Sequence, residues 1–224
     1  MEMIEQRLEP AFLMGREIGH SLGTPLAVVL GNLTRMKNQT QVADDMNLAM
    51  EDMLLMTRKC VEMQQKLSSI SRSVPVQKSH FDIFPEIQLI LDQIFSCSSK
   101  IVVFENKSEF MKIKILGHSV SFVELLEIIL QNAFDFTSPA GKIKISYSCN
   151  RNDGQDQIHF IDDGCGIDSH IIHKIFDPFF TTKPFSSGHG LSLTRAAVIL
   201  KSHGGRIDVW QRNQGTEFMI SIPK

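Results

Sequence analysis

The sequence lacks an excess of charge of either sign, because 23 lysine and arginine residues stand against 25 aspartate and glutamate residues. Whole-chain charge therefore gives no argument for nucleic-acid binding. The sequence also lacks a run of 18 apolar residues, and its first ten residues have neither the basic nor the apolar region of a signal peptide. We expect a soluble, cytoplasmic segment that makes no membrane contact of its own.

Cysteine pairs and regularly spaced metal ligands are missing as well. The four cysteines are scattered along the chain, at Cys60, Cys97, Cys149 and Cys165. We expect reduced thiols rather than a disulfide framework, as in a cytoplasmic protein. His170 and His173 lie three positions apart beside Asp168, but no third ligand follows at a telling spacing, so a metal site there is disfavoured.

The first part of the chain, residues 1–72, has a helical pattern. The whole chain has 224 residues, enough for one large domain or two modest ones, and its hydrophobic fraction of 42% is typical of globular proteins. We predict two long helices joined by a polar turn at residues 37–40. Apolar residues of the second helix recur every three or four positions, at Met46, Ala49, Met53, Met56, Cys60, Met63, Leu67 and Ile70. Because one hairpin cannot bury both apolar lines, we expect a dimeric four-helix bundle.

The second part, residues 73–224, alternates between β-branched runs and helical patterns after a linker at residues 71–75. The expected strands cover residues 101–104, 113–116, 142–147, 158–161, 206–210 and 217–222. The expected helices cover residues 85–95, 121–136 and 191–202. Antiparallel strand pairs with helices on one side predict an α+β sandwich.

Three polar features of this second domain are candidates for ligand binding. Asp162–Ile167 places a carboxylate and alternating glycines at the end of an apolar strand, which fits a ligand site or an ordinary tight turn. Gly188–Leu191 precedes a helix whose N–H groups suit phosphate, although its spacing is neither that of a dinucleotide fold nor that of a P-loop. Asn132, inside an apolar helix, is either a structural amide or a metal ligand.

His20 is the candidate site residue of the first domain. It lies off the apolar line of the first helix, between Ile18 and Leu22, so we expect it to face solvent. Pro25 follows five residues later, where it would kink the helix.

Together these motifs resemble the transmitter core of a two-component sensor histidine kinase, over nearly the whole chain. Residues 20–26, His-Ser-Leu-Gly-Thr-Pro-Leu, are similar to the phosphoacceptor box, and residues 130–137 are similar to the asparagine box. Residues 162–167 and 188–193 resemble the two glycine boxes, and residues 215–218 resemble the last Gly-Thr element. Residues 176–183, Phe-Asp-Pro-Phe-Phe-Thr-Thr-Lys, match the phenylalanine box in a form similar to the nitrogen-regulation branch of the family.

The resemblance implies an ATP-dependent protein-histidine autokinase of a bacterial two-component system. Residues 1–72 would be the dimerisation and phosphotransfer hairpin of a homodimer. Residues 73–224 would be a catalytic ATP-binding domain of the gyrase, Hsp90, histidine kinase and MutL type. His20 would take the γ-phosphoryl group and pass it to an Asp of a response regulator receiver domain. The signal would come from an upstream sensor domain or sensor protein outside this chain.

The same resemblance implies the ligands of ATP and Mg²⁺. Asp162 would accept a hydrogen bond from the adenine amino group, Asn132 would ligate Mg²⁺, and Lys183 would contact phosphate from a lid over residues 176–188. The nucleotide-binding residues implied are Asn132, Asp162, Gly164, Gly166, Ile167, Phe180, Lys183, Gly188, His189, Gly190, Leu191 and Thr216.

Four positions depart from the family pattern, and one of them is Ser192, which replaces a glycine of the second glycine box. Ser21 replaces the acid that orients the phosphoacceptor imidazole, so we expect general-base assistance of roughly 10²–10⁴-fold to be missing and the kinase to be slow. Ile128 replaces a common asparagine, and Asp135 stands where Lys or Arg is common.

These departures keep an alternative function open, and one further function is disfavoured. The alternative is a nucleotide-binding phosphotransfer scaffold or a phosphatase-biased partner of the regulator, in which the side chain of Thr24 would orient water. A hydrolase of the same superfamily is disfavoured, because it needs Glu four residues before the Mg²⁺ ligand. Glu127 lies five residues before Asn132, rotated by about 140° on a helix.

Overall fold

The computed structural model describes residues 26–38, 44–71, 78–95, 98–105, 107–111, 113–150, 154–183 and 189–223. The chain divides into two compact units, which are described separately below. The first contains Met1–Arg72 with Thr181–Leu191, and the second contains Ser73–Phe180 with Ser192–Lys224. None of the helices within these described ranges has the length and apolar character needed to cross a membrane.

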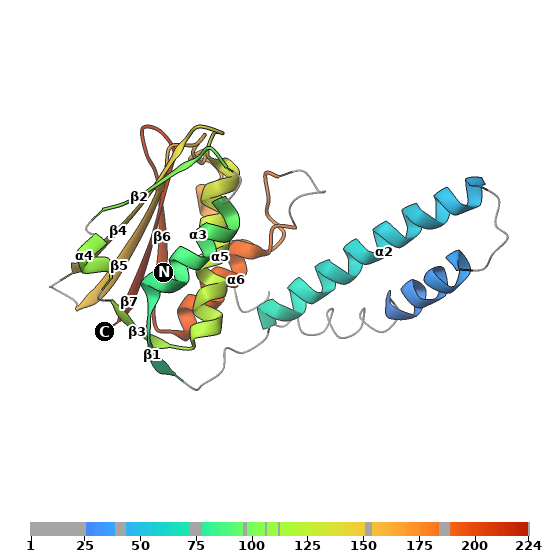
Figure 1. The fold of residues 1–224 in the computed structure, drawn as a ribbon, viewed down its shortest axis with the longest axis horizontal. Coiled ribbons are helices and arrows are strands. Elements are labelled where there is room, and N and C mark those ends of the chain that lie inside the picture. The colour runs from blue at the N-terminus through green and yellow to red at the C-terminus, as the bar shows by residue number, and fades with distance from the viewer. Residues whose placement is uncertain are drawn as a thin grey trace. The chain divides into compact units, whose positions relative to one another are not determined.

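Two helical segments lie within the described residues of the first unit (Figure 1). Residues 26–37 are helical, and α2 runs from Asp44 to Ser71. An ion pair between Lys37 Nζ and Glu51 Oε1, 2.8 Å apart, joins the end of the first segment to the second turn of α2. This arrangement agrees in part with the predicted hairpin, whose remaining residues lie outside the described ranges.

Within the single chain, α2 buries apolar residues that lie partly outside the predicted line. Met50, Leu54 and Leu67 are buried, whereas Met53 and Met56 are 47% and 52% exposed. Of the predicted apolar line, Leu67 is buried within the single chain. Because α2 carries apolar residues on more than one side, spacing alone does not show which side packs within the chain and which would pack against a partner. The predicted line was expected to pack in a dimeric bundle, and it stays a prediction. The exposed methionines leave an apolar line on the surface of the single chain.

The second unit is built on a five-stranded sheet with the order β2-β4-β5-β7-β6 (Figure 1). The strands are β2 (Ile101–Phe104), β4 (Lys142–Asn150), β5 (Gln155–Asp162), β6 (Arg206–Gln211) and β7 (Thr216–Pro223). All neighbours are antiparallel except β2 and β4, which are parallel. The sequence-based expectation of antiparallel pairs alone was therefore wrong at this edge. A crossover that contains a helix separates β2 from β4, and such a connection returns the chain in the same direction.

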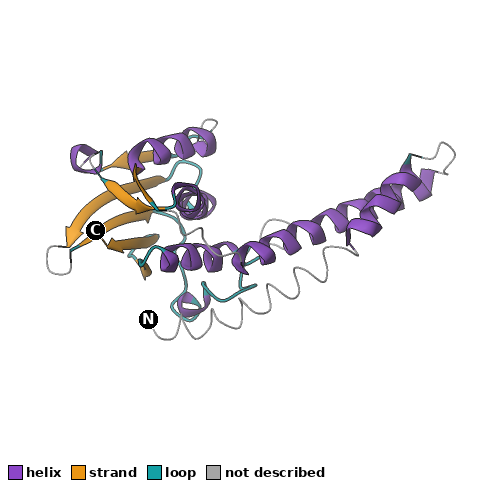
Figure 2. Ribbon diagram, turned by 90° about the horizontal axis from the view of Figure 1, so that it is seen from below, coloured by secondary structure: helices purple, strands orange, loops and turns teal. Residues whose placement is uncertain are grey.

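The helices of the second unit cover one face of this sheet (Figure 2). They are α3 (Ile83–Phe95), α5 (Ser119–Phe136) and α6 (Ser192–Ser202), with the short α4 (Lys107–Phe110) and the 3₁₀ helix η1 (Ile172–Lys174) between strands. A two-stranded antiparallel sheet pairs β1 (Ser79–Asp82) with β3 (Lys114–Gly117). The sequence did not predict β1, which has a single apolar residue, Phe81.

The core lies between the helices and the sheet. Along β5 every second residue is buried, including Ile158, Phe160 and Asp162. This period of two directs one side of the strand toward the helices. Phe122 and Ile129 of α5 are fully buried opposite that side. The α+β architecture is therefore confirmed, and it places Asp162 at the inner face of the sheet where β5 ends.

Candidate nucleotide-binding site

Asp162 is a buried carboxylate at the end of β5, with 4% of its surface exposed. Its Oδ1 accepts hydrogen bonds from the backbone N–H groups of Gly164 at 2.9 Å and Thr216 at 3.3 Å. Burial raises the pKa of Asp162, and these two N–H groups oppose the rise because they stabilise the ionised form. The chain therefore fixes the direction of the carboxyl group, as recognition of a single donor requires.

Glycines allow close packing around the turn that follows β5. Gly215 has φ +81°, and a Cβ there would lie 1.8 Å from the carbonyl oxygen of Asp162. Gly166 has φ +74°, and its Cβ would lie 2.3 Å from Nε2 of Gln211. A side chain at Gly215 would force the backbone apart, and one at Gly166 would displace the side chain of Gln211. The β6–β7 hairpin is thus held directly against the turn that follows β5.

The last turn of α5 forms another side of the region. A Cβ on Gly164 would lie 2.3 Å from the carbonyl oxygen of Phe136, so the glycine turn contacts the end of this helix. Thr137 closes the helix, because its Oγ1 donates to the carbonyl of Ala133 at 2.6 Å. Asn132 lies about one turn before Phe136 and is half-buried. The structure therefore brings Asp162, Gly164 and Thr216 together and carries Asn132 on the adjoining helix.

Two of the departures from the family pattern, Asp135 and Ile128, lie on α5. Asp135 is exposed, and its Oδ1 accepts a hydrogen bond from Nε2 of Gln131 at 2.7 Å. This contact between residues four apart follows the helix surface. Ile128 is half-buried and Glu127 is exposed. The negative charge of Asp135 is thus solvated and hydrogen-bonded along its own helix.

The phenylalanine box begins in the second unit. Ile175 and Phe176 are buried, while Phe179 is 47% exposed and has φ +67°, an unusual value for a residue other than glycine. Phe180 is half-buried, and its N–H donates to the carbonyl of Asp177 at 3.2 Å. The side chain of Phe179 is therefore presented to solvent by a backbone conformation that costs energy.

The remaining predicted ligands stay predictions. Lys183, His189, Gly190 and Leu191 fall in the segment Thr181–Leu191, which belongs to the first unit. Within it, the N–H of Lys183 donates to Oγ1 of Thr181 at 3.1 Å, Gly190 has φ +67°, and Leu191 is buried. His20, Ser21, Thr24 and Gly188 lie outside the described residues, and so does Cys97. The other cysteines, Cys60, Cys149 and Cys165, are free thiols.

Two residues of this region were missed by sequence reasoning. Gln211 accepts the N–H of Ile167 at 2.6 Å through Oε1 and contacts Gly166. Thr194, fully buried in the first turn of α6, donates its hydroxyl to the carbonyl of Phe176 at 3.0 Å. Both contacts join positions far apart in the sequence, so no local pattern could have indicated them.

The donor set fits a nucleotide. Asp162 offers a buried acceptor to an amino group, and Gly164 and Gly166 let the end of α5 and the side chain of Gln211 pack directly against the adjoining turn. Asn132 carries an amide oxygen, a ligand that Mg²⁺ accepts. In the part of the chain that the structure describes, no cluster of three or more His, Cys, Asp or Glu side chains could hold a metal by itself.

Comparison with protein families matches residues 117–224 to the histidine kinase-, DNA gyrase B-, and HSP90-like ATPase family. The matched segment begins at the end of β3 and contains α5, Asp162 and the β6–β7 hairpin. Residues 117–224 are therefore an ATPase domain of this family. The GHKL-type fold expected from the sequence is confirmed for this domain.

The proteins and solved structures that this chain resembles include histidine kinases. The signal transduction histidine-protein kinase AtoS of Escherichia coli (strain K12) is 42% identical over 101 residues, which are 45% of this chain and 16% of AtoS. Full-length ShkA in complex with AMPPNP superposes with a TM-score of 0.71 at 19% identity, over 94% of this chain and 45% of ShkA. Histidine kinase ThkA in complex with the response regulator protein TrrA gives a TM-score of 0.65 at 21% identity, over 99% of this chain and 64% of that chain.

These matches establish homology to histidine kinases for the ATPase domain and the fold for most of the chain. The chain spans about a sixth of AtoS, so the match does not carry over the activity of that whole protein. The membership of the nitrogen-regulation branch stays a prediction.

Proposed function

We propose that this chain is the transmitter core of a sensor histidine kinase, which binds ATP and phosphorylates its own His20. The observation that carries the proposal is the buried Asp162, whose Oδ1 is fixed by two backbone N–H groups inside an ATPase domain homologous to histidine kinases. Residues 73–224 bind the nucleotide, and residues 1–72 form the phosphotransfer hairpin.

Asp162 accepts a hydrogen bond from the adenine amino group in this proposal. Gly164, Gly166 and Ile167 line the base, and Thr216 holds the carboxylate in place through its N–H. Phe180 lies at the start of the lid over residues 176–188. Specificity for adenine follows because a buried acceptor rejects a base that offers no donor at that position.

The phosphate end of the nucleotide is bound by residues 188–191, Gly-His-Gly-Leu, at the start of α6, with Lys183 as a cationic contact. A helix N-terminus suits phosphate because its first N–H groups have no partner within the helix. Asn132 ligates Mg²⁺ through its amide oxygen. When bound, Mg²⁺ neutralises charge on the β- and γ-phosphates, and phosphoryl transfer depends mainly on such alignment and charge neutralisation.

His20 accepts the γ-phosphoryl group at a neutral ring nitrogen and later passes it to an Asp of a response regulator receiver domain. Support for such a partner comes from ThkA, a kinase of the same fold whose structure contains the response regulator protein TrrA. Ser21 offers a hydrogen bond but no charge, so the imidazole lacks the carboxylate that would raise its basicity. We therefore expect slow autophosphorylation.

Residues 1–72 form a homodimer in this proposal. Met53 and Met56 of α2 are about half exposed in the single chain, and Met46 is 57% exposed. Apolar side chains gathered on one exposed helix mark an interaction surface. A second hairpin would cover them in a four-helix bundle.

The decisive experiment is incubation with γ-labelled ATP and Mg²⁺, followed by tests of the label in acid and in alkali. Wild type and a His173→Ala control should carry a label that is lost in acid and kept in alkali, as expected for a phosphoramidate. His20→Ala should carry none and should still bind ATP. Label that persists in His20→Ala would show that another residue is the phosphoacceptor.

A second candidate function is a nucleotide-binding phosphotransfer scaffold or a phosphatase-biased partner of the response regulator. Ser21 favours this candidate, because it stands where the family has an acid. In that case Thr24 would orient water toward a phosphorylated regulator. Asp135 supports this candidate little, because it is exposed and hydrogen-bonded to Gln131. Ser21→Glu distinguishes the two: a kinase limited by the missing base should be labelled faster, while a scaffold should stay unlabelled.

A further inference from the structure

The contact between α5 and α6 is mostly apolar and includes small side chains. Residues Ala196 to Leu200 of α6 are all buried, and the first two are alanines. Apolar contact is favourable but not directional, so it resists sliding or rotation of one helix along the other only weakly. A directional polar interaction is needed to fix the position of α6 along α5.

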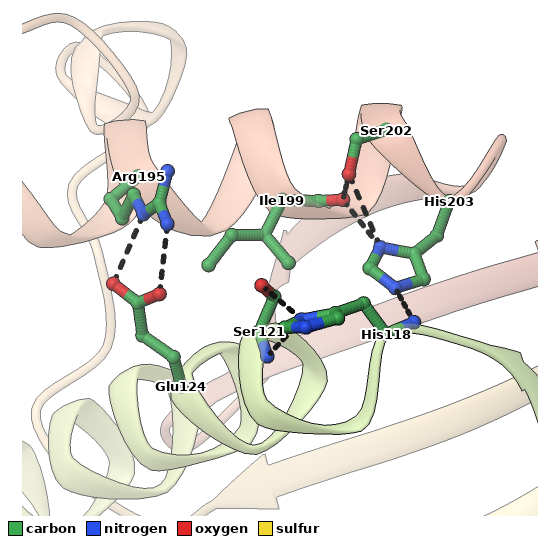
Figure 3. A network of polar contacts seen from close by, with 7 residues as sticks. All are labelled: His118, Ser121, Glu124, Arg195, Ile199, Ser202 and His203. Atoms are coloured by element: carbon green, nitrogen blue, oxygen red, sulfur yellow. Dashed lines mark hydrogen bonds and ion pairs between the residues drawn. The ribbon is translucent and has the colours of Figure 1, made fainter. Parts of the chain in front are cut away.

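Two polar links supply this direction, one at each end of α6 (Figure 3). At the start, Nε and Nη2 of Arg195 contact Oε1 and Oε2 of Glu124, each at 3.0 Å. At the end, Nε2 of His203 accepts the backbone N–H of His118 at 3.0 Å, and Nδ1 of the same ring lies 2.8 Å from the carbonyl of Ile199. His118 also caps α5, so each link joins α6 to α5.

Of the two links, the one between Arg195 and Glu124 has the stricter requirements for charge and geometry. The side chain of Arg195 is only 8% exposed, and that of Glu124 is 37% exposed. A guanidinium ion so far removed from water requires an anion with matching geometry. Two parallel N–H···O contacts fix both the distance and the relative orientation of the two groups. The pair therefore acts as a directional clamp between two helices.

The position of this clamp relates it to the nucleotide site. Glu124 lies eight residues before Asn132 on α5, a separation of about 12 Å along the helix axis. Arg195 lies in the first turn of α6, next to Thr194, which bonds the carbonyl of Phe176. The clamp thus connects the helix that carries Asn132 with the helix turn that follows the phosphate-binding residues in the proposed function.

We propose that Glu124 and Arg195 are positioning residues, which hold the first turn of α6 at a fixed distance from Asn132. This inference rests on the proposed function, because it concerns the phosphate end of the same nucleotide. The clamp acts on the Mg²⁺-bound triphosphate and leaves the adenine end, fixed by Asp162 and Thr216, unchanged.

The experiment compares the binding of two ligands by calorimetry, ATP with Mg²⁺ and adenosine, in matched variants of the whole chain. Glu124→Gln and Arg195→Lys should bind ATP with Mg²⁺ roughly 10-fold to 100-fold more weakly, as expected when supporting contacts around a site are lost. Both should bind adenosine within about twofold of wild type. The control Glu105→Gln breaks the exposed pair of Glu105 with Lys144 in the same unit and should change neither affinity.

A double variant separates positioning from simple stabilisation. Glu124→Gln with Arg195→Met removes both charges, so it avoids the isolated buried guanidinium of Glu124→Gln and should melt near the wild-type temperature. The positioning role requires that its affinity for ATP with Mg²⁺ stays reduced. If the double variant regains both the wild-type melting temperature and the wild-type affinity for ATP with Mg²⁺, the inference is overturned. It is also overturned if the variants lose affinity for adenosine and for ATP equally. A wild type that binds neither ligand would instead overturn the proposed function, and the positioning role with it.

Discussion

The replacement Asp162→Asn tests the adenine contact with almost no change in shape. In the wild type, Oδ1 of Asp162 accepts two backbone N–H groups. The amide oxygen of Asn can keep both of these hydrogen bonds. Its NH₂ group, however, replaces the second carboxylate oxygen and would meet the adenine amino group donor to donor.

The magnitude follows from one lost hydrogen bond and one buried donor left without a partner. Such a change costs about 1–3 kcal/mol of binding free energy. This corresponds to a nucleotide affinity that is roughly 5-fold to 150-fold weaker. The stability of the fold should move the other way, because burial raises the pKa of Asp162 and so disfavours its charged form in the folded state. We expect a melting temperature equal to or above that of wild type.

Calorimetry of ATP and ADP binding, with a thermal melt of each variant, measures both effects. Asp163→Asn is the matched control, because Asp163 is the adjacent carboxylate and its Oδ2 accepts the N–H of Lys142 at 2.9 Å instead. The control should bind nucleotide like wild type. A nucleotide affinity of Asp162→Asn within twofold of wild type would refute the adenine contact. A loss of nucleotide affinity that is explained by unfolding of the variant in the thermal melt would refute it as well.

Three other predictions concern the two units. Replacing Met53 and Met56 with Glu should convert the dimer into monomers, as measured by light scattering, because it places charge in the apolar bundle. A wild type that is monomeric at high micromolar concentration would contradict the bundle. Thr194→Val should lower the free energy of unfolding by about 1–3 kcal/mol in denaturant titrations, because the buried carbonyl of Phe176 loses its donor, and Thr194→Ser should not. Burial lowers the pKa of His203 below its ordinary value of 6.5. Below pH 6.5, His203 of the unfolded chain therefore binds a proton that His203 of the folded chain does not bind. The contribution of His203 to the free energy of unfolding should be fully present above pH 6.5 and should fall below it, by at most ~1.4 kcal/mol per pH unit. His203→Gln should flatten this dependence, and an unchanged slope would show that other groups cause it.

The sequence predicted the strands and helices of the second unit well because their signals are local. The predicted strand at residues 158–161 and helix at residues 121–136 correspond to β5 and α5, extended by a few residues. Period-two and helical patterns report burial directly. By contrast, β1 contains too few apolar residues to give such a pattern, and the parallel pairing of β2 with β4 depends on chain direction in space.

The candidate site was predictable in part, for a related reason. Asp162 and its glycines form one continuous motif, whereas their neighbours Gln211 and Phe136 come from distant segments. The contact partner of Arg195 lies 71 positions away at Glu124, so only the packed fold reveals the clamp. On α2, spacing found an apolar line but could not decide between a face buried within the chain and one left exposed.

The order of the strands has a consequence for synthesis. The last strand along the chain, β7, lies between β5 and β6, and β6 pairs with no other strand of the five-stranded sheet. A growing chain that stops before residue 216 therefore carries a sheet of three strands with an open edge at β5, and Asp162 lacks the N–H of Thr216. Such an edge can pair with other chains. In the proposed function, the adenine acceptor therefore gains its second backbone donor only after Thr216–Pro223 has been made, and we expect ATP to stabilise the nascent domain only from that stage.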